Sequence, residues 1–502
     1  MVKKLAAFVH EAARAREAGM VWGSSASEER CAASRVQKPR RFVRAALLAA
    51  ASLTAIGAGA VRAETIGGAL IKAYLTNPDI NTQRAAVRVA DENVPKANAG
   101  YLPTVAATGN IGMERAQTSI AGANGSLAGT ADITLKPRGY GIQANETVFN
   151  GNRTLNSIRQ AESQVFGARE QLRNTEQNTL LSGVTAYMDV LEDTAILDLD
   201  NNNVDVLKEQ LRETRDRFTV GEVTRTDVAQ AEASLAQGQG TALSAVATLQ
   251  AAVARYRQFI GDQPTNLAPV RPIVKPVPKS LAEAIAISQV EHPSISASLH
   301  GVDAAQLQVK IAEGALYPTI GLSASVTNQY DASGIPGFHV LAGQFMGQIN
   351  IPIYQGGAEY ASTRQAKESL SQQEIQTDSL RNQVRQAVVA AWGLNQAAVG
   401  VVRAARASVS ANEVALTGVR EEAKVGQRTT LDVLNAQQAL LQARTTLVQA
   451  EHDQVVDSYQ LLSAVGRLNI PTLGLAVAEY DPRVHFDQVK SKWIGLRTPS
   501  GQ

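Results

Sequence analysis

Residues 220–235 read VGEVTRTDVAQAEASL, and residues 425–440 read VGQRTTLDVLNAQQAL. The two stretches share the pattern Val-Gly-x-x-Thr-x-x-Asp-Val at an offset of 205 residues. Closer to the N-terminus the offset becomes 215, where Pro78 matches Pro293. Internal repeats of this length decide the architecture of a chain. The sequence therefore contains two copies of one structural unit.

The two copies differ in length at one place. The first copy carries ten extra residues between about 106 and 140, and this window contains SIAGANGSLAGT at 119–130. Clusters of Gly and Ser are typical of loops, so a longer loop is expected here. The repeat predicts this organisation: a first structural repeat at 64–261, a Pro-rich linker at 262–279, a second repeat at 280–466 and a tail at 467–502.

The N-terminal segment has the features of a secretory signal. A basic stretch ending at Arg44 precedes the apolar run ALLAAASLTAIGAGA at 45–59, and the small residues Val61 and Ala63 follow it. An apolar run of about 15 residues with a small-residue cleavage site is typical of a signal peptide, whereas a spanning helix needs about 20. We expect residues 1–63, a signal peptide with an N-terminal extension, to be removed.

Composition argues against several function classes. The segment 1–63 holds 11 of the 48 Lys and Arg residues and 4 of the 46 Asp and Glu residues, so the rest of the chain has a net charge of −5. This balance predicts no nucleic-acid-binding surface. The single cysteine, Cys31, lies in the same segment, so no disulfide or thiol site is expected after cleavage. Because HExxH, GxSxG and P-loop patterns do not occur, we expect no enzyme activity, no cofactor and no metal site.

Short runs in each copy alternate in hydrophobicity with a period of two. In the second copy, residues 320–326 and 345–353 alternate apolar with small or polar side chains, and the first copy does so more weakly at 105–111 and 140–144. Runs of about ten such residues are typical of membrane-spanning β-strands that face lipid on one side. No later segment has 18 consecutive apolar residues, so no spanning helix is expected. The alternative is a soluble hairpin packed on the helices.

Two long segments, 152–219 and 357–424, contain no proline and are rich in good helix formers. A helix of this length extends about 100 Å and indicates a coiled coil. Helices are also expected at about 224–261 and at 280–314, the second capped by Ser280. Stacked end to end, these two shorter helices match the length of one long helix, which predicts that they run back along it.

The repeated motif predicts a tight turn between a long helix and the helix that returns. Glycine ends the long helix in the left-handed conformation, threonine caps the next helix, and aspartate follows three residues later as in a capping box. These residues are Gly221, Thr224 and Asp227 in the first copy and Gly426, Thr429 and Asp432 in the second.

The strands set a condition on assembly. Two strands per copy give four per chain, and open strand edges are not viable in lipid. Single-chain barrels of the outer membrane begin at about eight strands. If these strands lie in a membrane, at least two chains must assemble.

Several stretches together resemble the TolC family of outer membrane efflux factors. They are the duplicated tips, INIPIYQGGAEYASTRQA at 349–366, the strand starts YLPT and LYPT, and the closing YDPRVHFDQVKSKWIGL at 480–496. The resemblance covers about 64–490. It implies an all-α coiled-coil tunnel joined to a transmembrane β-barrel. In this arrangement a homotrimer contributes four strands per protomer to a 12-stranded barrel in outer membrane lipid.

The same resemblance implies a function and partners. The helical tunnel would lie in the periplasm, where its tips meet a periplasmic adaptor protein coupled to an inner-membrane pump. The assembly would be a passive exit duct for drugs and other exported substrates. One alternative is a channel dedicated to type I protein secretion, which no sequence feature separates from drug efflux. An alternative of another class is a soluble periplasmic coiled-coil scaffold, which would lack the amphipathic strands.

The resemblance also implies roles at the tips. Asp432 matches a ring of aspartates that constricts the pore, while Asn435 replaces the second aspartate of that ring. Arg428 matches an arginine that latches the entrance shut near Asp227, and Ala423 replaces a tyrosine of the latch. The remaining tip residues are expected to form the turns and contact the adaptor: Val220, Gly221, Thr224, Val425, Gly426 and Thr429.

Overall fold

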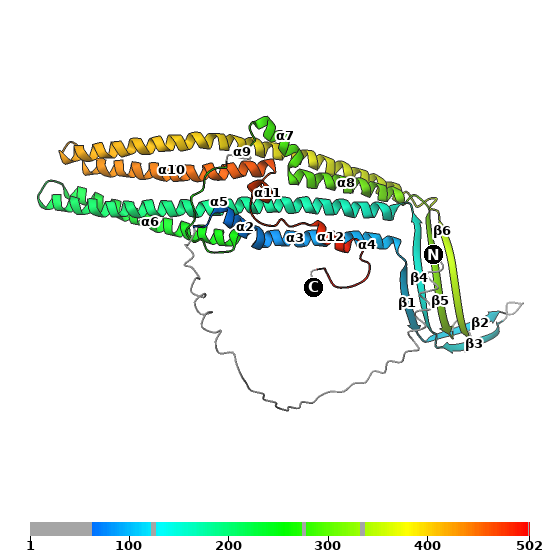
Figure 1. The fold of residues 1–502 in the computed structure, drawn as a ribbon. Coiled ribbons are helices and arrows are strands. Elements are labelled where there is room, and N and C mark those ends of the chain that lie inside the picture. Colours follow the sequence, from blue (N-terminus) through cyan, green and yellow to red (C-terminus); the bar gives the residue numbers. More distant parts are fainter. Residues whose placement is uncertain (1–62, 122–126, 274–277, 332–336, 500, 502) are drawn as a thin grey trace, which may run out of the picture. The chain divides into compact units, whose positions relative to one another are not determined.

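The computed structural model describes residues 63–121, 127–273, 278–331, 337–499 and 501 (Figure 1). The predicted signal segment, apart from Ala63, lies outside the described residues. The described residues belong to one unit of the chain, Val61–Gln502.

The chain runs through the same order of elements twice. The first pass consists of α2 (Ile66–Thr76), α3 (Pro78–Asp91), α4 (Asn93–Asn98), a 3-10 turn η1 (Ala99–Tyr101), β1 (Thr104–Ile111), β2 (Glu114–Ala121), β3 (Leu127–Leu135), β4 (Arg138–Asn150), α5 (Arg153–Thr219) and α6 (Arg225–Ile260). The second consists of α7 (Leu281–Glu291), α8 (Pro293–Gly314), β5 (Thr319–Tyr330), β6 (His339–Asn350), α9 (Ala358–Lys424) and α10 (Thr430–Val465). The short helices α11 (Ile470–Leu473) and α12 (Arg483–Val489) follow.

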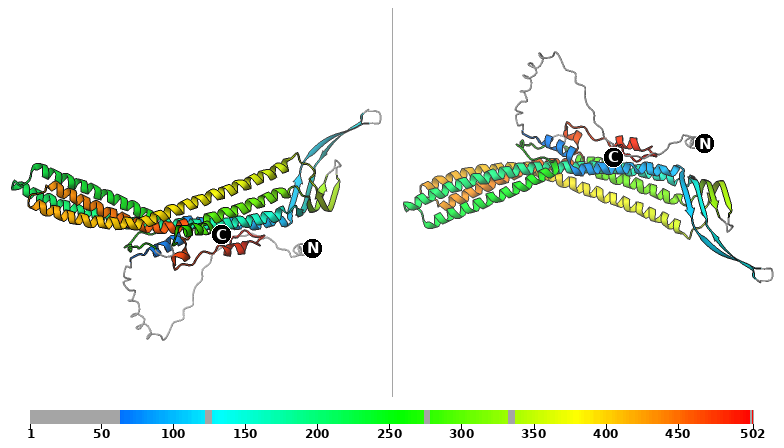
Figure 2. Two further views of the ribbon diagram at one scale, coloured as in Figure 1. Left: turned by 90° about the horizontal axis from the view of Figure 1, so that it is seen from above. Right: turned by 90° about the horizontal axis from the view of Figure 1, so that it is seen from below.

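The helices pack as two long hairpins with shorter helices beside them. The long helices α5 and α9 have 67 residues each, about 100 Å. Helix α5 contacts α6 toward its end and α8 toward its start, and α9 contacts α10 and α8 in the same way (Figures 1 and 2). Two shorter helices thus share the length of each long one.

The helix expected at 280–314 is interrupted, and this expectation was wrong. His292 has extended backbone angles between α7 and α8, and Pro293 begins α8. Asn77 and Pro78 separate α2 from α3 in the same way. A proline disfavours the helical conformation of the residue before it and is tolerated at a helix start. The Asn and His side chains then cap the new helices by accepting hydrogen bonds from Asp79 and Ser294.

Four strands form one antiparallel sheet in the order β1-β4-β5-β6. Its register places apolar residues opposite one another across the sheet, as in Ile142 opposite Val326 and Ala324 opposite Phe345. The alternate positions are polar, as in Ser325 opposite Gln344. Because directly opposed residues share a face, the sheet has one apolar and one polar face. The exposed Phe345 lies on the apolar face.

The window expected to be a longer loop is instead mostly a hairpin. Strands β2 and β3 pair antiparallel in a separate two-stranded sheet (Figure 1). The side chains of Arg115 and Asp132 form an ion pair across it. The extra residues therefore extend the β1–β4 connection as strands, because pairing satisfies the backbone groups that a loop of this length would leave open.

The largest core cluster lies where the first repeat meets the end of α10. Leu180, Val184 and Tyr187 of α5 pack there with Tyr256 of α6 and Leu462 of α10. The Tyr187 hydroxyl lies 2.6 and 2.8 Å from two backbone carbonyl oxygens at the start of α2 and in the linker. The linker is therefore fixed to α5 at this level.

Helix α9 is long and apolar enough to cross a membrane by length and composition, the one such helix among the described residues. The sequence predicted no membrane-spanning helix, and by length and composition α9 is an exception to that prediction. Helix α9 nevertheless contacts α8 and α10 much as α5 contacts α8 and α6. We therefore interpret it as a helix of the tunnel layer.

Candidate functional site at the helical tips

Both helical hairpins end in the same backbone turn. Gly221 and Gly426 have φ angles of +81° and +80°, a left-handed conformation that glycine adopts without the strain of a Cβ atom. The N–H groups of Gly221 and Glu222 donate to carbonyl oxygens of the last helical turn at 3.0 and 2.9 Å. Gly426 and Gln427 do the same at 3.1 and 2.9 Å. This is the Schellman arrangement, which satisfies the helix ends without tertiary contacts.

A capping box starts each returning helix. In the first tip, the backbone N–H and hydroxyl of Thr224 donate to Asp227 Oδ2 at 2.8 and 2.7 Å. In the second, the same groups of Thr429 donate to Asp432 Oδ2 at 3.0 and 2.9 Å. Hydrogen bonds from these threonines lower the pKa of both carboxyl groups. Both aspartates are therefore ionised at neutral pH and occupied as caps.

The tips differ in the polarity of their ion pairs. In the first tip, Arg217 on the helix pairs with Glu222 on the loop at 3.0 Å. In the second, Glu422 on the helix pairs with Arg428 on the loop at 2.8 Å. Position 217 corresponds to 422 at the offset of 205, so the charge of the paired residue on the long helix is opposite in the two tips. The first loop thus carries an acid and the second a base.

The expected latch residues do not meet within one chain. Arg428 pairs with Glu422, while Asp227 is held by Thr224. Ala423 is buried in a small apolar cluster between the two helices of its hairpin. A latch between Arg428 and Asp227 therefore remains a prediction.

The expected constriction residues lie on one side of α10. Asp432 and Asn435 are three residues apart, so they are neighbours on the helix surface. Between them, Val433 and Leu434 are buried against the rest of the bundle. Asn435 also lines a cleft of about 490 Å³ enclosed by α5, α6 and α10. The structure leaves the side chain of Asn435 exposed and that of Asp432 partly so.

The adaptor-contact residues include an exposed apolar pair. Val220 and Val425, which end the two long helices, are each 72% exposed. Exposed apolar side chains at the far end of a molecule are typical of a contact surface. The glycines and threonines beside them are engaged in the turns and caps described above.

A cleft of about 810 Å³ separates the two hairpins near the tips. Its α5 wall carries Asp205, Glu209 and Glu213, and its α9 wall carries Arg420 and Lys424. Opposite charges on facing walls attract, and they are screened while the cleft is filled with water.

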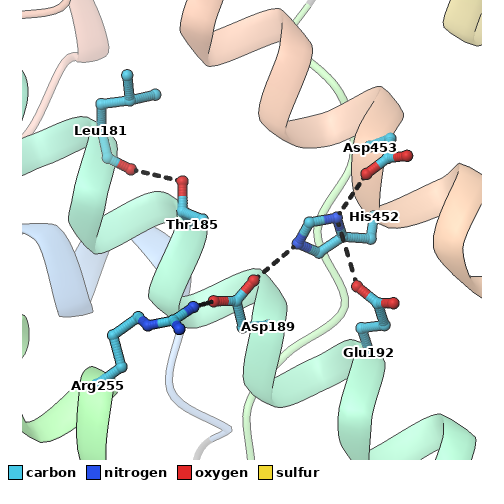
Figure 3. Close-up of polar contacts among 7 residues, drawn as sticks. All are labelled: Leu181, Thr185, Asp189, Glu192, Arg255, His452 and Asp453. Atoms are coloured by element: carbon cyan, nitrogen blue, oxygen red, sulfur yellow. Dashed lines mark hydrogen bonds and ion pairs between the residues drawn. The ribbon is translucent and has the colours of Figure 1, made fainter. Parts of the chain in front are cut away.

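The structure also shows a polar cluster that the sequence analysis did not find (Figure 3). His452 on α10 lies 3.1 Å from Asp189 and 3.5 Å from Glu192 on α5, and 3.0 Å from Asp453. Arg255 on α6 also pairs with Asp189, at 2.6 Å. Burial lowers the pKa of His452, but hydrogen bonds and nearby carboxylates outweigh it and raise the pKa to about 9. The charged imidazole thus joins the first hairpin to the second.

No sequence signal pointed to this cluster, since His452 and Asp189 are 263 residues apart and meet only through the helix packing. Among the residues that the structure describes, no group of three or more His, Cys, Asp or Glu side chains is placed to hold a metal ion. The cluster is therefore read as an ionic contact between helices.

These features define a class of protein. A sheet with one apolar face, continuous with helices of about 100 Å that end in capped turns, is the subunit architecture of a membrane channel with a helical tunnel. The sequence matches the outer membrane efflux protein family over residues 70–262 and 285–467, and the chain belongs to this family.

Individual relatives agree with this assignment. The chain is 44% identical to the outer membrane efflux protein BepC of Brucella suis biovar 1 (strain 1330), over 91% of this chain and 98% of BepC. It is 24% identical to the outer membrane protein TolC of Escherichia coli (strain K12), over 81% and 83% of the two chains. It is also 24% identical to the alkaline protease secretion protein AprF of Pseudomonas aeruginosa, over 64% and 68%.

Solved structures share the fold. The Campylobacter jejuni CmeC outer membrane channel superposes with a TM-score of 0.71 at 15% identity, covering 86% of this chain and 90% of CmeC. The predicted TolC-family membership and the combination of helical tunnel and membrane strands are confirmed. The predicted location, the outer membrane with the helical tunnel in the periplasm, is confirmed as well.

Proposed function

We propose that this protein forms the exit duct of a tripartite export system, a passive conduit for drugs and other exported substrates. One observation carries the proposal: the same chain has a sheet with an apolar face at one end and two capped tips at the other. Such a chain spans the outer membrane and presents its tips deep in the periplasm. Substrates would then pass through the periplasm and the outer membrane inside one continuous channel.

Three copies would complete the duct. Strands β1 and β6 are the edges of the four-stranded sheet, and unpaired edges are not viable in lipid. Three sheets joined edge to edge give the 12-stranded barrel expected for the homotrimer. Each chain contributes two tips, so the periplasmic end becomes a ring of six. The tips would then contact a periplasmic adaptor bound to an inner-membrane pump, which supplies the energy.

The tips supply a gate in this proposal. Asp432 and Asn435 from each protomer would line the narrowest part of the pore. Arg428 would exchange its partner Glu422 for Asp227 of an adjacent tip and hold the entrance shut. Arg428 and Glu422 are both about half exposed, so water screens their attraction and the exchange costs little. A latch of such pairs therefore opens readily.

A second candidate is a channel dedicated to type I protein secretion. The similarity to AprF, named as a protease secretion protein, favours it. Deleting the gene separates the two candidates: increased sensitivity to drugs supports efflux, while loss of a secreted protein from the medium supports secretion.

Single-channel recording tests the duct and the gate together. The mature protein, purified as a verified oligomer, is inserted into a planar bilayer and compared with the variant Asp227→Ala/Arg428→Ala. We expect small, cation-preferring steps that become larger in this variant. The matched control is Arg444→Ala/Glu413→Ala, which breaks an exposed ion pair within the second hairpin, away from the tip residues of the latch.

The outcomes distinguish the claims. Larger steps in the latch variant alone support the gate, whereas equal steps in all three proteins remove the latch and keep the duct. A verified oligomer that gives no steps and separates from outer membrane fractions would instead favour the periplasmic scaffold.

A further inference from the structure

The tail after the second repeat is docked on the first helices of the chain. His485 Nδ1 lies 2.9 Å from Asp91 Oδ2, and the Asp91 side chain is fully buried. Val489 at the end of α12 is also fully buried. The Asn98 amide donates to the backbone oxygen of Lys490 at 3.2 Å. These contacts fix α12 along α3 and α4, and nothing in the proposed export function requires them.

The docking site lies next to the start of the membrane sheet. Helix α4 and the turn η1 lead directly into β1, which starts at Thr104. A cleft of about 330 Å³ brings Trp493 together with Pro95, Asn98 and Leu102. Leu102 is two residues from the first residue of β1. Trp493 therefore lies at the level where the chain enters the membrane from the periplasm.

The segment beyond α12 exposes large apolar side chains. Trp493, Ile494 and Leu496 have exposed fractions of 74%, 72% and 102%. Tyr101 and Leu102, at the foot of β1, are also exposed. A concentration of apolar side chains outside any core marks a contact with something apolar. Trp and Tyr in particular are enriched at the boundary between membrane and water.

Cations surround these apolar side chains. The stretch QVKSKWIGLR at 488–497 contains three basic residues and no acidic one. The Lys492 ammonium donates to the backbone oxygen of Arg497, which closes a turn around Trp493. Lys490 pairs with Asp487 at 2.7 Å, leaving an excess of positive charge. Basic residues beside exposed aromatic and aliphatic ones are typical of segments that lie in a membrane interface.

We propose that residues 490–497 bind the periplasmic leaflet of the outer membrane. The side chains of Trp493, Ile494 and Leu496 insert at the headgroup boundary, and Lys492 and Arg497 contact anionic phospholipid headgroups. The apolar contact continues the lipid-facing side of the sheet through the foot of β1. This contact sets the depth and tilt of the helical tunnel, because α12 joins the segment rigidly to α3 and α4. The inference requires the outer membrane location but not the proposed transport role.

Tryptophan fluorescence tests the proposal directly. The tryptophans are Trp22, in the predicted signal segment, Trp392 and Trp493. The variant Trp392→Phe of the mature protein therefore reports on Trp493 alone. The variant is reconstituted as the oligomer into vesicles of two lipids. One is phosphatidylglycerol; the other is phosphatidylcholine with bromine near the headgroup end of its acyl chains. We expect the brominated lipid to quench at least half of the emission, and the water-soluble quencher acrylamide to have little effect.

Two matched controls calibrate the assay, both built without Trp392 and Trp493. Phe345→Trp, on the apolar face of the sheet, is measured with lipid brominated near the ends of its acyl chains; it reports quenching by lipid and verifies insertion. Val220→Trp, at a tip, has an exposure matching that of Trp493 and reports no contact with lipid. An unquenched Phe345→Trp control would be a failed reconstitution, so membrane insertion is judged separately from the tail.

Two outcomes would overturn the proposal. Quenching of Trp493 by acrylamide but not by brominated lipid would place the segment in water. Protection from both quenchers would place it between copies of the chain or against another protein. The charge contribution has its own test: Lys492→Glu/Arg497→Glu should reduce the quenching in phosphatidylglycerol vesicles. If quenching stays the same when phosphatidylglycerol is omitted, and also in this variant, then Lys492 and Arg497 do not contact anionic headgroups.

Discussion

The imidazole of His452 is expected to stabilise the packing of the two hairpins in a pH-dependent way. Its side chain is only 12% exposed, and carboxylates lie on two sides of it. The charged groups facing it come from every helix packed there: Asp189, Glu192 and Asp193 on α5, Arg255 on α6, and Asp453 and Asp457 on α10. Three of these carboxyl groups, on Glu192, Asp193 and Asp457, have a raised pKa, mainly because of burial. A neutral side chain at 452 would leave this excess of negative charge uncompensated.

The size of this stabilisation follows from the shift in the pKa of His452. The pKa of His452 is raised from an ordinary value of 6.5 to about 9 in the folded protein. At about 1.4 kcal/mol per pH unit, this difference stabilises the fold by about 3 kcal/mol when the imidazole is charged in both states. A raised folded pKa gives stability that is fully present below 6.5 and lost as the pH rises through about 9. At pH 7 about 2.5 kcal/mol remains.

Thermal unfolding of the detergent-solubilised protein measures this contribution. Wild type and His452→Gln are compared from about pH 6 to about pH 9.5, where the gap between their stabilities should shrink from about 3 kcal/mol to a few tenths. The control is His300→Gln, which removes a partly exposed imidazole that lies 3.6 Å from Asp303. A gap of constant size across this range would show that His452 is not charged in the fold, and the reasoning would fail.

Three further outcomes follow from the structure. Phe345→Lys puts a charge on the lipid face of β6 and should cost about 2–4 kcal/mol at mid-membrane, reducing insertion into vesicles, whereas Gln344→Lys on the polar face should insert normally. Gly426→Ala forces a side chain into a φ of +80° and should lower stability by about 1–2 kcal/mol in thermal unfolding, while Gly418→Ala, within α9, should not destabilise. His485→Ala removes the hydrogen-bond partner of a buried carboxylate and should weaken tail docking by about 1–3 kcal/mol, seen as faster limited proteolysis before α12; unchanged proteolysis would contradict this.

The parts of the fold that depend on local interactions could be predicted from the sequence. The helix end at Gly426 and the capping box of Thr429 and Asp432 involve residues within a few positions of one another, so the sequence contains all of their partners. The two faces of the sheet follow from a period of two, which holds for any strand with one side in lipid. The long helices were predictable because proline is absent from them.

The parts that depend on tertiary context could not be predicted in the same way. Pro293 was recognised as a repeated residue, but a helical period on both sides concealed that it starts a new helix. The β2–β3 hairpin has a composition typical of loops and gains its structure from strand pairing. The contact of His452 with Asp189 joins helices from different repeats, and no spacing in the sequence signals it. Its existence follows only from the way in which α5 and α10 pack.

The reversed charges of the two tips bear on how they work together. The backbone turns at Gly221 and Gly426 are nearly identical, and either polarity of an exposed ion pair contributes about as little to folding. Folding therefore gives no reason for Glu222 on one loop and Arg428 on the other. In the proposed ring the two kinds of tip alternate, so each acidic loop has basic loops as neighbours. In that ring, a Glu222 released from Arg217 and an Arg428 released from Glu422 would attract each other across neighbouring tips, whereas two loops of like charge would repel. The duplication thus supplies the same backbone turn twice, and in the proposed ring the sign reversal would make neighbouring tips complementary.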